Sequence, residues 1–205
     1  MGRQQLGNSV IDQAASLPFR FDASSHTYTD LRTGEELCHI TGMLEQTGWI
    51  DRRWYTEESS DRGVAIHKLT ADYDLGALHV ESCQSPFRGY LLGHVQAVSR
   101  ACPTWLAVEE PLVEPKWRFG GRPDRDCIVY GMRSTWEIKS GQPERAHQVQ
   151  LALQAILLGG LAGLPPESIG RFCEYVKDNG KFAVERFTDR RDVDEAYRVI
   201  RECCR

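Results

Sequence analysis

The segment 143–163 constrains the fold most, because its sequence PERAHQVQLALQAILLGGLAG predicts an amphipathic helix that ends at its glycines. Three strand-like runs precede it, at 105–113, 122–130 and 134–139. A hairpin at 168–187 follows, with Asn179-Gly180 as a strong turn signal. This order of elements predicts an α/β domain with one central mixed β-sheet flanked by helices.

The remaining segments predict further helices and an N-terminal hairpin. The run 19–41 reads as a hairpin that turns at Arg32-Thr33-Gly34. Helices are expected from Thr41 and from Asp61, with these two residues as caps. Two more are expected at 87–102, before Pro103, and at 189–204. We interpret the chain as one domain, in which 1–60 is an N-terminal hairpin and helix elaboration and 61–205 is the core.

Composition agrees with one compact domain. The 205 residues are 41% hydrophobic and 26% charged, which is enough for a real core. The start of the chain is too polar for a secretory signal and no apolar run reaches membrane-spanning length, so we expect a soluble protein with no membrane partner. Seven cysteines, without a C-x-x-C pair, argue against a disulfide framework and favour a reduced compartment.

Charge gives a mixed indication about nucleic acid. The formal net charge is −4, so no global positive field attracts a polyanion. Two basic groups occur locally, and each by itself reads as solvated surface. They are Lys116, Arg118, Arg122 and Arg125, and then Arg186, Arg190 and Arg191.

The stretch GGRPDRDCIVYGMRSTWEIKSG (120–141) carries the candidate chemistry. Asp124 follows a glycine-rich turn, and the strand pairing brings it to the same end of the sheet as Glu137. Glu137 and Lys139 share one face of their strand, while Ile138 points to the core. Two close carboxylates favour a divalent cation between them, and a nearby ammonium suits phosphodiester hydrolysis. An exposed hairpin surface explains the same residues, and Asp126 competes with Asp124 as ligand.

Taken together with motifs elsewhere in the chain, this stretch resembles the PD-(D/E)XK nuclease superfamily. Within that superfamily it is most similar to the RecB-like, phage-exonuclease and Cas4-like branch. The resemblance rests on GRPD, WEIKSG and HQVQLALQA, and it covers nearly the whole chain in order. Gly63 to His67 matches the upstream G-x-x-x-H, and V-E-E-P matches the strand with a glutamate. Gln150 to Gln154 matches Q-x-x-x-Y, with Gln154 in place of the usual tyrosine. A restriction-endonuclease-like core is the implied fold.

The resemblance also implies roles for individual residues. The metal ligands would be His67, Asp124, Glu137 and the Ile138 carbonyl. Lys139 would be the catalytic lysine, with Gln150 beside it. Glu109, preferred to Glu110, would act near the metal or through water. Further contacts to the substrate would come from Arg118, Arg122, Arg125, His147 and Gln154; His147, Gln150 and Gln154 share one helix face.

The expected activity is hydrolysis of DNA by a metal-activated water, most simply by an exonuclease of the phage or recombination type. The cofactor would be one or two Mg²⁺ or Mn²⁺ ions, and no iron–sulfur cluster is expected because the terminal cysteines lack its spacing. Candidate partners are DNA, a helicase or single-strand annealing protein, and further copies of the chain, in bacterial or phage-infected cytoplasm. The alternatives are a structure- or sequence-specific endonuclease on the same fold, and a non-catalytic nucleic-acid-binding module.

Overall fold

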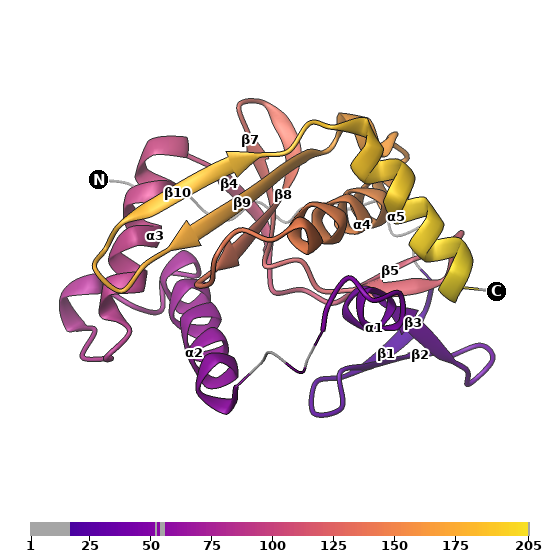
Figure 1. The fold of residues 1–205 in the computed structure, drawn as a ribbon, viewed down its shortest axis with the longest axis horizontal. Helices are drawn as coiled ribbons and strands as arrows, with labels where there is room; N and C mark the ends of the chain where they lie inside the picture. The colour runs from indigo at the N-terminus through magenta and orange to yellow at the C-terminus, as the bar shows by residue number, and fades with distance from the viewer. Residues whose placement is uncertain (1–16, 52, 54–55, 205) are drawn as a thin grey trace.

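Two five-stranded sheets, rather than the single expected sheet, form the β structure of this mixed α/β protein. The computed structural model describes residues 17–51, 53 and 56–204; the polar start of the chain lies outside this part. Figure 1 shows the sheet with β8, β9 and β10 on one side of the molecule and the strands β1 to β3 on the other. Both sheets are mixed, since each contains one parallel pair.

One sheet has the order β10-β9-β8-β7-β4 and contains the predicted runs 122–130 and 134–139 and the first half of the run 105–113. Its strands are β4 (Thr104–Val108), β7 (Arg125–Val129), β8 (Met132–Lys139), β9 (Gly170–Val176) and β10 (Phe182–Arg186). All neighbours are antiparallel except β8 and β9. A parallel pair requires a crossover, which α4 (Arg145–Ala162) supplies.

The second sheet has the order β1-β2-β3-β6-β5. Its strands are β1 (Phe19–Asp22), β2 (Thr27–Asp30), β3 (Glu36–His39), β5 (Leu112–Glu114) and β6 (Phe119–Gly121). The predicted hairpin is a three-stranded meander: the turn at Gly34 joins β2 to β3, and a turn capped by Asp22 joins β1 to β2. Because β3 pairs with β6, the elaboration 1–60 and the core 61–205 share this sheet.

The run 105–113 was expected to be one strand, and this prediction is wrong. β4 ends at Val108 and β5 begins at Leu112 in the other sheet. Glu109 between them has a left-handed backbone, with φ of 52°, and leaves the extended path. Pro111 cannot donate a hydrogen bond to a ladder, so the chain crosses between the sheets here.

The helices begin at residues other than the predicted caps. His39, not Thr41, caps α1 (Ile40–Gln46), since its imidazole accepts a hydrogen bond from the Gly42 amide. Thr56, not Asp61, caps α2 (Glu57–Asp74), through a capping box with Ser59. The other helices are α3 (Arg88–Ala101) and α5 (Arg190–Cys203), with short 3₁₀ turns η3 (Val80–Ser82) and η4 (Pro166–Ser168). Cys203 and Cys204 lie at the end of α5, as expected.

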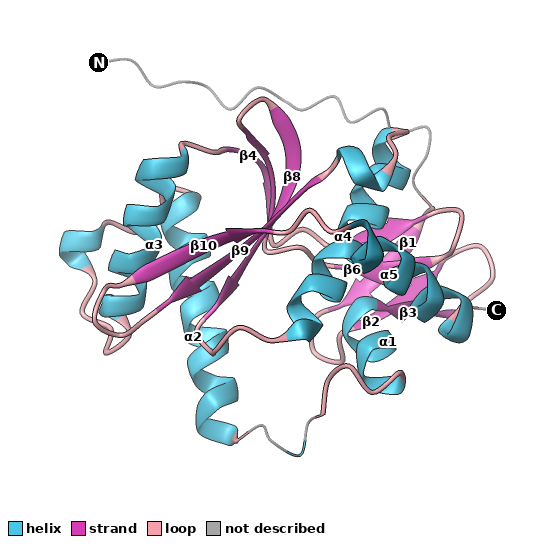
Figure 2. Cartoon of the chain, turned by 45° about the horizontal axis from the view of Figure 1, so that its top comes forward, coloured by secondary structure: helices cyan, strands magenta, loops and turns pink. Residues whose placement is uncertain are grey.

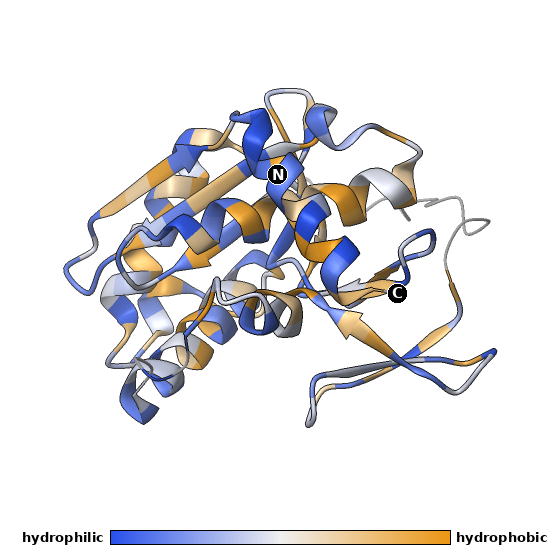
Figure 3. Ribbon diagram, turned by 45° about the vertical axis from the view of Figure 1, so that its right-hand side comes forward, coloured by the Kyte–Doolittle hydropathy of each residue, from blue (hydrophilic) through white to orange (hydrophobic). Residues whose placement is uncertain are grey.

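α4 lies between the sheets (Figure 2). It was expected to be amphipathic, but residues on all of its faces are buried from Leu151 to Gly159. Val149, Leu153 and Leu157 pack with α1 and α5, whereas Leu151 packs on Cys173 and Tyr175 of β9. The C-terminal helix α5 does alternate between hydrophobic and hydrophilic residues (Figure 3). Among the described residues, no helix is both long and apolar enough to span a membrane.

Candidate metal centre

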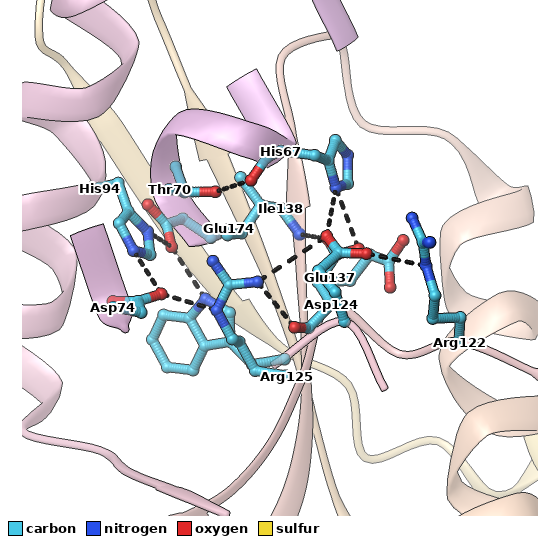
Figure 4. Close-up of polar contacts among 12 residues, drawn as sticks. His67, Thr70, Asp74, His94, Arg122, Asp124, Arg125, Glu137, Ile138 and Glu174 are labelled. Atoms are coloured by element: carbon cyan, nitrogen blue, oxygen red, sulfur yellow. Dashed lines mark hydrogen bonds and ion pairs between the residues drawn. The ribbon is translucent and has the colours of Figure 1, made fainter. Parts of the chain in front are cut away.

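Three side chains from three elements converge at one end of the β10–β4 sheet. His67 lies on α2, Glu109 follows β4 and Asp124 immediately precedes β7. The Nδ1 atom of His67 is 3.0 Å from Asp124 Oδ1 and 3.3 Å from Glu109 Oε1 (Figure 4). One ligand atom from each residue lies within 4.8 Å of the others, a spacing that a single metal ion can bridge.

Asp124 is held at both its backbone and its carboxylate. Its Oδ2 atom accepts a hydrogen bond from the Ile138 amide at 2.7 Å. Its carbonyl accepts from the Glu109 amide at 3.0 Å and from the Arg125 guanidinium at 2.6 Å. Asp124 is only 4% exposed, and its carboxylate lines the cleft in a fixed position. These bonds orient Oδ1 toward His67.

Glu137 and Lys139 lie across from Asp124, as predicted. The register of β7 with β8 sets Arg125 opposite Trp136, which places the residue before β7 opposite Glu137. Lys139 donates to Glu137 Oε1 at 2.8 Å. Burial lowers the pKa of Lys139, but the Glu137 and Asp124 carboxylates outweigh it and raise that pKa. Ile138 is fully buried, on the opposite face of the strand.

Two glutamines of α4 hold the Glu137 carboxylate. Gln150 donates to Glu137 Oε1 and Gln154 donates to Glu137 Oε2, both at 2.7 Å. Gln154 also accepts a hydrogen bond from the Thr135 hydroxyl at 2.5 Å. Both oxygens of Glu137 are therefore occupied by donors, and its carboxylate is fixed at the edge of the cleft.

The candidate cluster includes two of the four groups expected as metal ligands, His67 and Asp124. Glu109, expected near the metal, lies in the cluster with His67 and Asp124, while Glu110 is exposed. Glu137 lies in the same cleft, but its oxygens are engaged by Lys139 and the two glutamines. Ile138 contributes its amide to Asp124.

The electrostatics of the centre favour a cation between the carboxylates. Burial lowers the pKa of His67, but Asp124 and Glu109 outweigh burial and raise it to about 10. His67 is thus an imidazolium at neutral pH in the metal-free protein. A metal ion held by His67 would have to displace this proton, because only neutral imidazole coordinates.

The centre opens into a cleft of about 590 Å³. Its walls come from α2, the start of α1, the end of β6 and the loop that follows it. A second hollow of about 400 Å³ continues beyond Lys139. The two adjoin at the centre, because Gly63, His67, Lys139 and Gln150 are among the residues that line both.

The structure brings one of the three predicted arginines to the cleft. Arg122 lines it, with Nε 3.0 Å from Glu109 Oε2. Arg118 instead pairs with Asp30 and Glu35 of the β1–β3 region. The Arg125 side chain is fully buried and binds Asp74, so it is not exposed to a phosphate in this conformation.

Two other predicted residues lie beside the centre rather than in it. His147 lines the second hollow and is 3.1 Å from the Tyr175 hydroxyl. Burial, reinforced by the charge of Lys139, lowers the pKa of His147 to about 4. Asp126, the competitor of Asp124, lies outside the candidate cluster, and both of its carboxylate oxygens accept hydrogen bonds from Arg133.

Asp74, His94 and Glu174 were not predicted, although they lie directly behind the centre (Figure 4). They come from α2, α3 and β9, so no spacing in the sequence links them. The one local signal is a histidine within a mostly apolar run, YLLGHVQAV.

In comparisons with known proteins, no family model and no curated protein matches this chain. The fold and the site therefore define the class by themselves. The chain is a mixed α/β protein with a candidate His/Glu/Asp metal centre at the end of one sheet.

Proposed function

We propose that this chain is a metal-dependent nuclease that hydrolyses DNA phosphodiester bonds on a restriction-endonuclease-like core. One observation carries the proposal: the His67, Glu109 and Asp124 cluster shares a cleft with the Glu137–Lys139 pair. Carboxylates beside an ammonium are the groups that metal-assisted phosphodiester hydrolysis requires. An exonuclease that acts at DNA ends is the form that the sequence resemblance favours.

The residues present fit a divalent cation. Two carboxylates and one imidazole suit Mn²⁺ well and Mg²⁺ less strongly, because Mg²⁺ prefers oxygen ligands. His67, Glu109 and Asp124 would hold the ion. When bound, such an ion supplies a water of lowered pKa and positive charge beside the phosphate.

The protein's own side chains supply the remaining functions. Lys139, charged because Glu137 and Asp124 favour its ammonium form, stabilises negative charge that grows on the phosphate. Glu137 positions Lys139 through their 2.8 Å ion pair. Gln150 and Gln154 fix Glu137 in turn, so the lysine is pre-organised before substrate arrives.

Contacts to the DNA backbone would come from the cleft wall rather than from net charge. The chain carries a formal charge of −4, so local cations must supply the attraction. Arg122 and Lys68 line the cleft, and the Lys68 side chain is 73% exposed. Backbone contacts of this kind carry no sequence information, so we expect little sequence preference.

The test uses end-labelled linear DNA and closed circular DNA, each with Mg²⁺, Mn²⁺ or EDTA. The wild type is compared with Lys139→Ala and with Lys181→Ala, an exposed lysine in the β9–β10 hairpin. We expect metal-dependent loss of linear DNA that Lys139→Ala reduces at least about 100-fold and Lys181→Ala leaves unchanged. Intact DNA with the wild type and every metal would refute the proposal. Cutting of circular DNA would assign an endonuclease.

A further inference from the structure

Four charged side chains form a buried group behind the candidate metal centre (Figure 4). They are Asp74, His94, Arg125 and Glu174, and each side chain is at most 1% exposed. His94 lies between the acids, with Nε2 3.0 Å from Asp74 Oδ2 and Nδ1 3.0 Å from Glu174 Oε2. The Trp136 indole also donates to Glu174 Oε2, at 2.8 Å. We call these four residues the buried charge network.

Arg125 connects the buried charge network to the metal centre. Its Nε donates to Asp74 Oδ2 at 2.6 Å, and its Nη1 donates to the Asp124 carbonyl at 2.6 Å. The same Nη1 is 3.9 Å from Glu109 Oε1. One guanidinium therefore contacts a residue of α2 and both carboxylate residues of the centre.

The network also fixes the helix that carries His67. His67 and Asp74 are seven residues apart on α2, which places them two turns apart on nearly the same side. Anchoring Asp74 to Arg125 and His94 therefore limits rotation and sliding of the helix surface that presents His67. Within α2 the buried residues are Ile66 and Thr70, so apolar packing alone fixes this helix weakly.

Stability does not by itself explain such a network. Burying four charges costs desolvation energy, and well-packed apolar residues of the same volume often stabilise a core equally well or better. The directional hydrogen bonds of the network instead hold α2, α3, β7 and β9 in one defined arrangement. The arrangement they define is the one that brings His67 to Asp124.

We infer that His94, with Asp74 and Glu174, is a positioning residue of the metal centre that sets the geometry of His67, Glu109 and Asp124 through Arg125 and α2. This inference rests on the proposed function, because it assumes that the centre binds a divalent ion. His94 does not touch the ligands and acts through the residues that do. Groups that orient metal ligands from behind typically change metal affinity 10- to 100-fold when mutated.

The test measures Mn²⁺ affinity of the full chain by the electron paramagnetic resonance signal of free Mn²⁺. His94→Gln should bind Mn²⁺ about 10- to 100-fold more weakly than wild type. Asp74→Asn, which keeps the shape of the side chain, should also weaken Mn²⁺ binding. The matched control is Arg171→Gln, which breaks a buried pair with Asp192 at 3.1 Å on β9 and α5. This control should lose thermal stability but keep its Mn²⁺ affinity.

The outcomes separate the two proposals. Wild-type affinity in folded His94→Gln, or an equal loss in Arg171→Gln, would overturn the positioning role and leave the nuclease proposal intact. If His94→Gln fails to fold by circular dichroism, Asp74→Asn decides in its place. A wild-type protein that binds no Mn²⁺ refutes the metal centre itself, and the positioning role with it.

Discussion

Replacing His94 should change how the stability of the protein depends on pH. Burial lowers the pKa of His94, but Glu174 and Asp74 outweigh burial and raise it from 6.5 to about 9. A base whose pKa is raised by folding stabilises the native state fully below its unfolded pKa. That stabilisation is then lost as the pH rises through the folded pKa. The window is therefore about pH 6.5 to 9.

The size of the effect follows from the shift. A pKa difference of about 2.5 units corresponds to about 3 kcal/mol of stability that disappears across the window. His67 shifts in the same direction, to about 10, so the wild type should lose stability from both histidines. The pKa of His147 is lowered to about 4, so this residue opposes folding only below about pH 6.5. The difference in pH dependence between the wild type and His94→Gln therefore isolates the contribution of His94.

The assay is urea unfolding followed by tryptophan fluorescence in EDTA, at pH values from 6 to 9.5. Across this range the free energy of unfolding of the wild type should fall by about 2 to 3 kcal/mol more than that of His94→Gln. At pH 6 the variant should nevertheless be less stable than the wild type. His79→Gln, at an exposed histidine of the α2–α3 connection, should follow the wild type. Parallel curves for wild type and His94→Gln would show that His94 is neutral in the folded protein and refute the reasoning.

Two further substitutions test the ligand set and the packing. Glu109→Gln should weaken Mn²⁺ binding at least about 10-fold in a calorimetric titration, whereas exposed Glu110→Gln should not; equal effects would remove Glu109 from the centre. Gly120→Ala should destabilise the protein by about 1 to 3 kcal/mol in urea unfolding, because its Cβ would lie 2.4 Å from the buried Tyr28 ring. Gly141→Ala, with no atom within 4 Å of its Cβ, is the control, and a similar loss there would contradict the packing argument.

Local signals predicted the elements around the centre well. Asn179-Gly180 does close the hairpin of β9 and β10, and the alternation in STWEIK correctly sends Ile138 to the core. These predictions succeed because a turn type and a side-chain period depend on a few neighbouring residues. The start of α2 also has a local signal, the capping box of Thr56 and Ser59, which the expected cap at Asp61 missed.

The division of the strands between two sheets could not be predicted from the sequence. The run 105–113 has the alternation of one strand, and only its Glu109-Glu110-Pro111 segment marks the break. Which sheet each half joins depends on tertiary packing, since β5 pairs with β6 and β4 pairs with β7. The place of Glu109 in the candidate cluster depends on the same crossing, because the residue lies where the chain leaves β4 and its carboxylate is 3.3 Å from His67.

The contacts of Gln154 explain what a glutamine can do at a position where the resembled motif has a tyrosine. A tyrosine at this position could donate one hydrogen bond to Glu137 and would present an aromatic ring. Gln154 instead accepts from Thr135 and donates to Glu137, so it connects two residues of β8 that lie on the same face. It is 2% exposed, which excludes it as a platform for a DNA base in this conformation. Gln154 therefore orients Glu137 from the wall of the cleft, which Arg122 and Lys68 also line. In the proposed nuclease, contacts to the DNA backbone would come from these two cations rather than from Gln154.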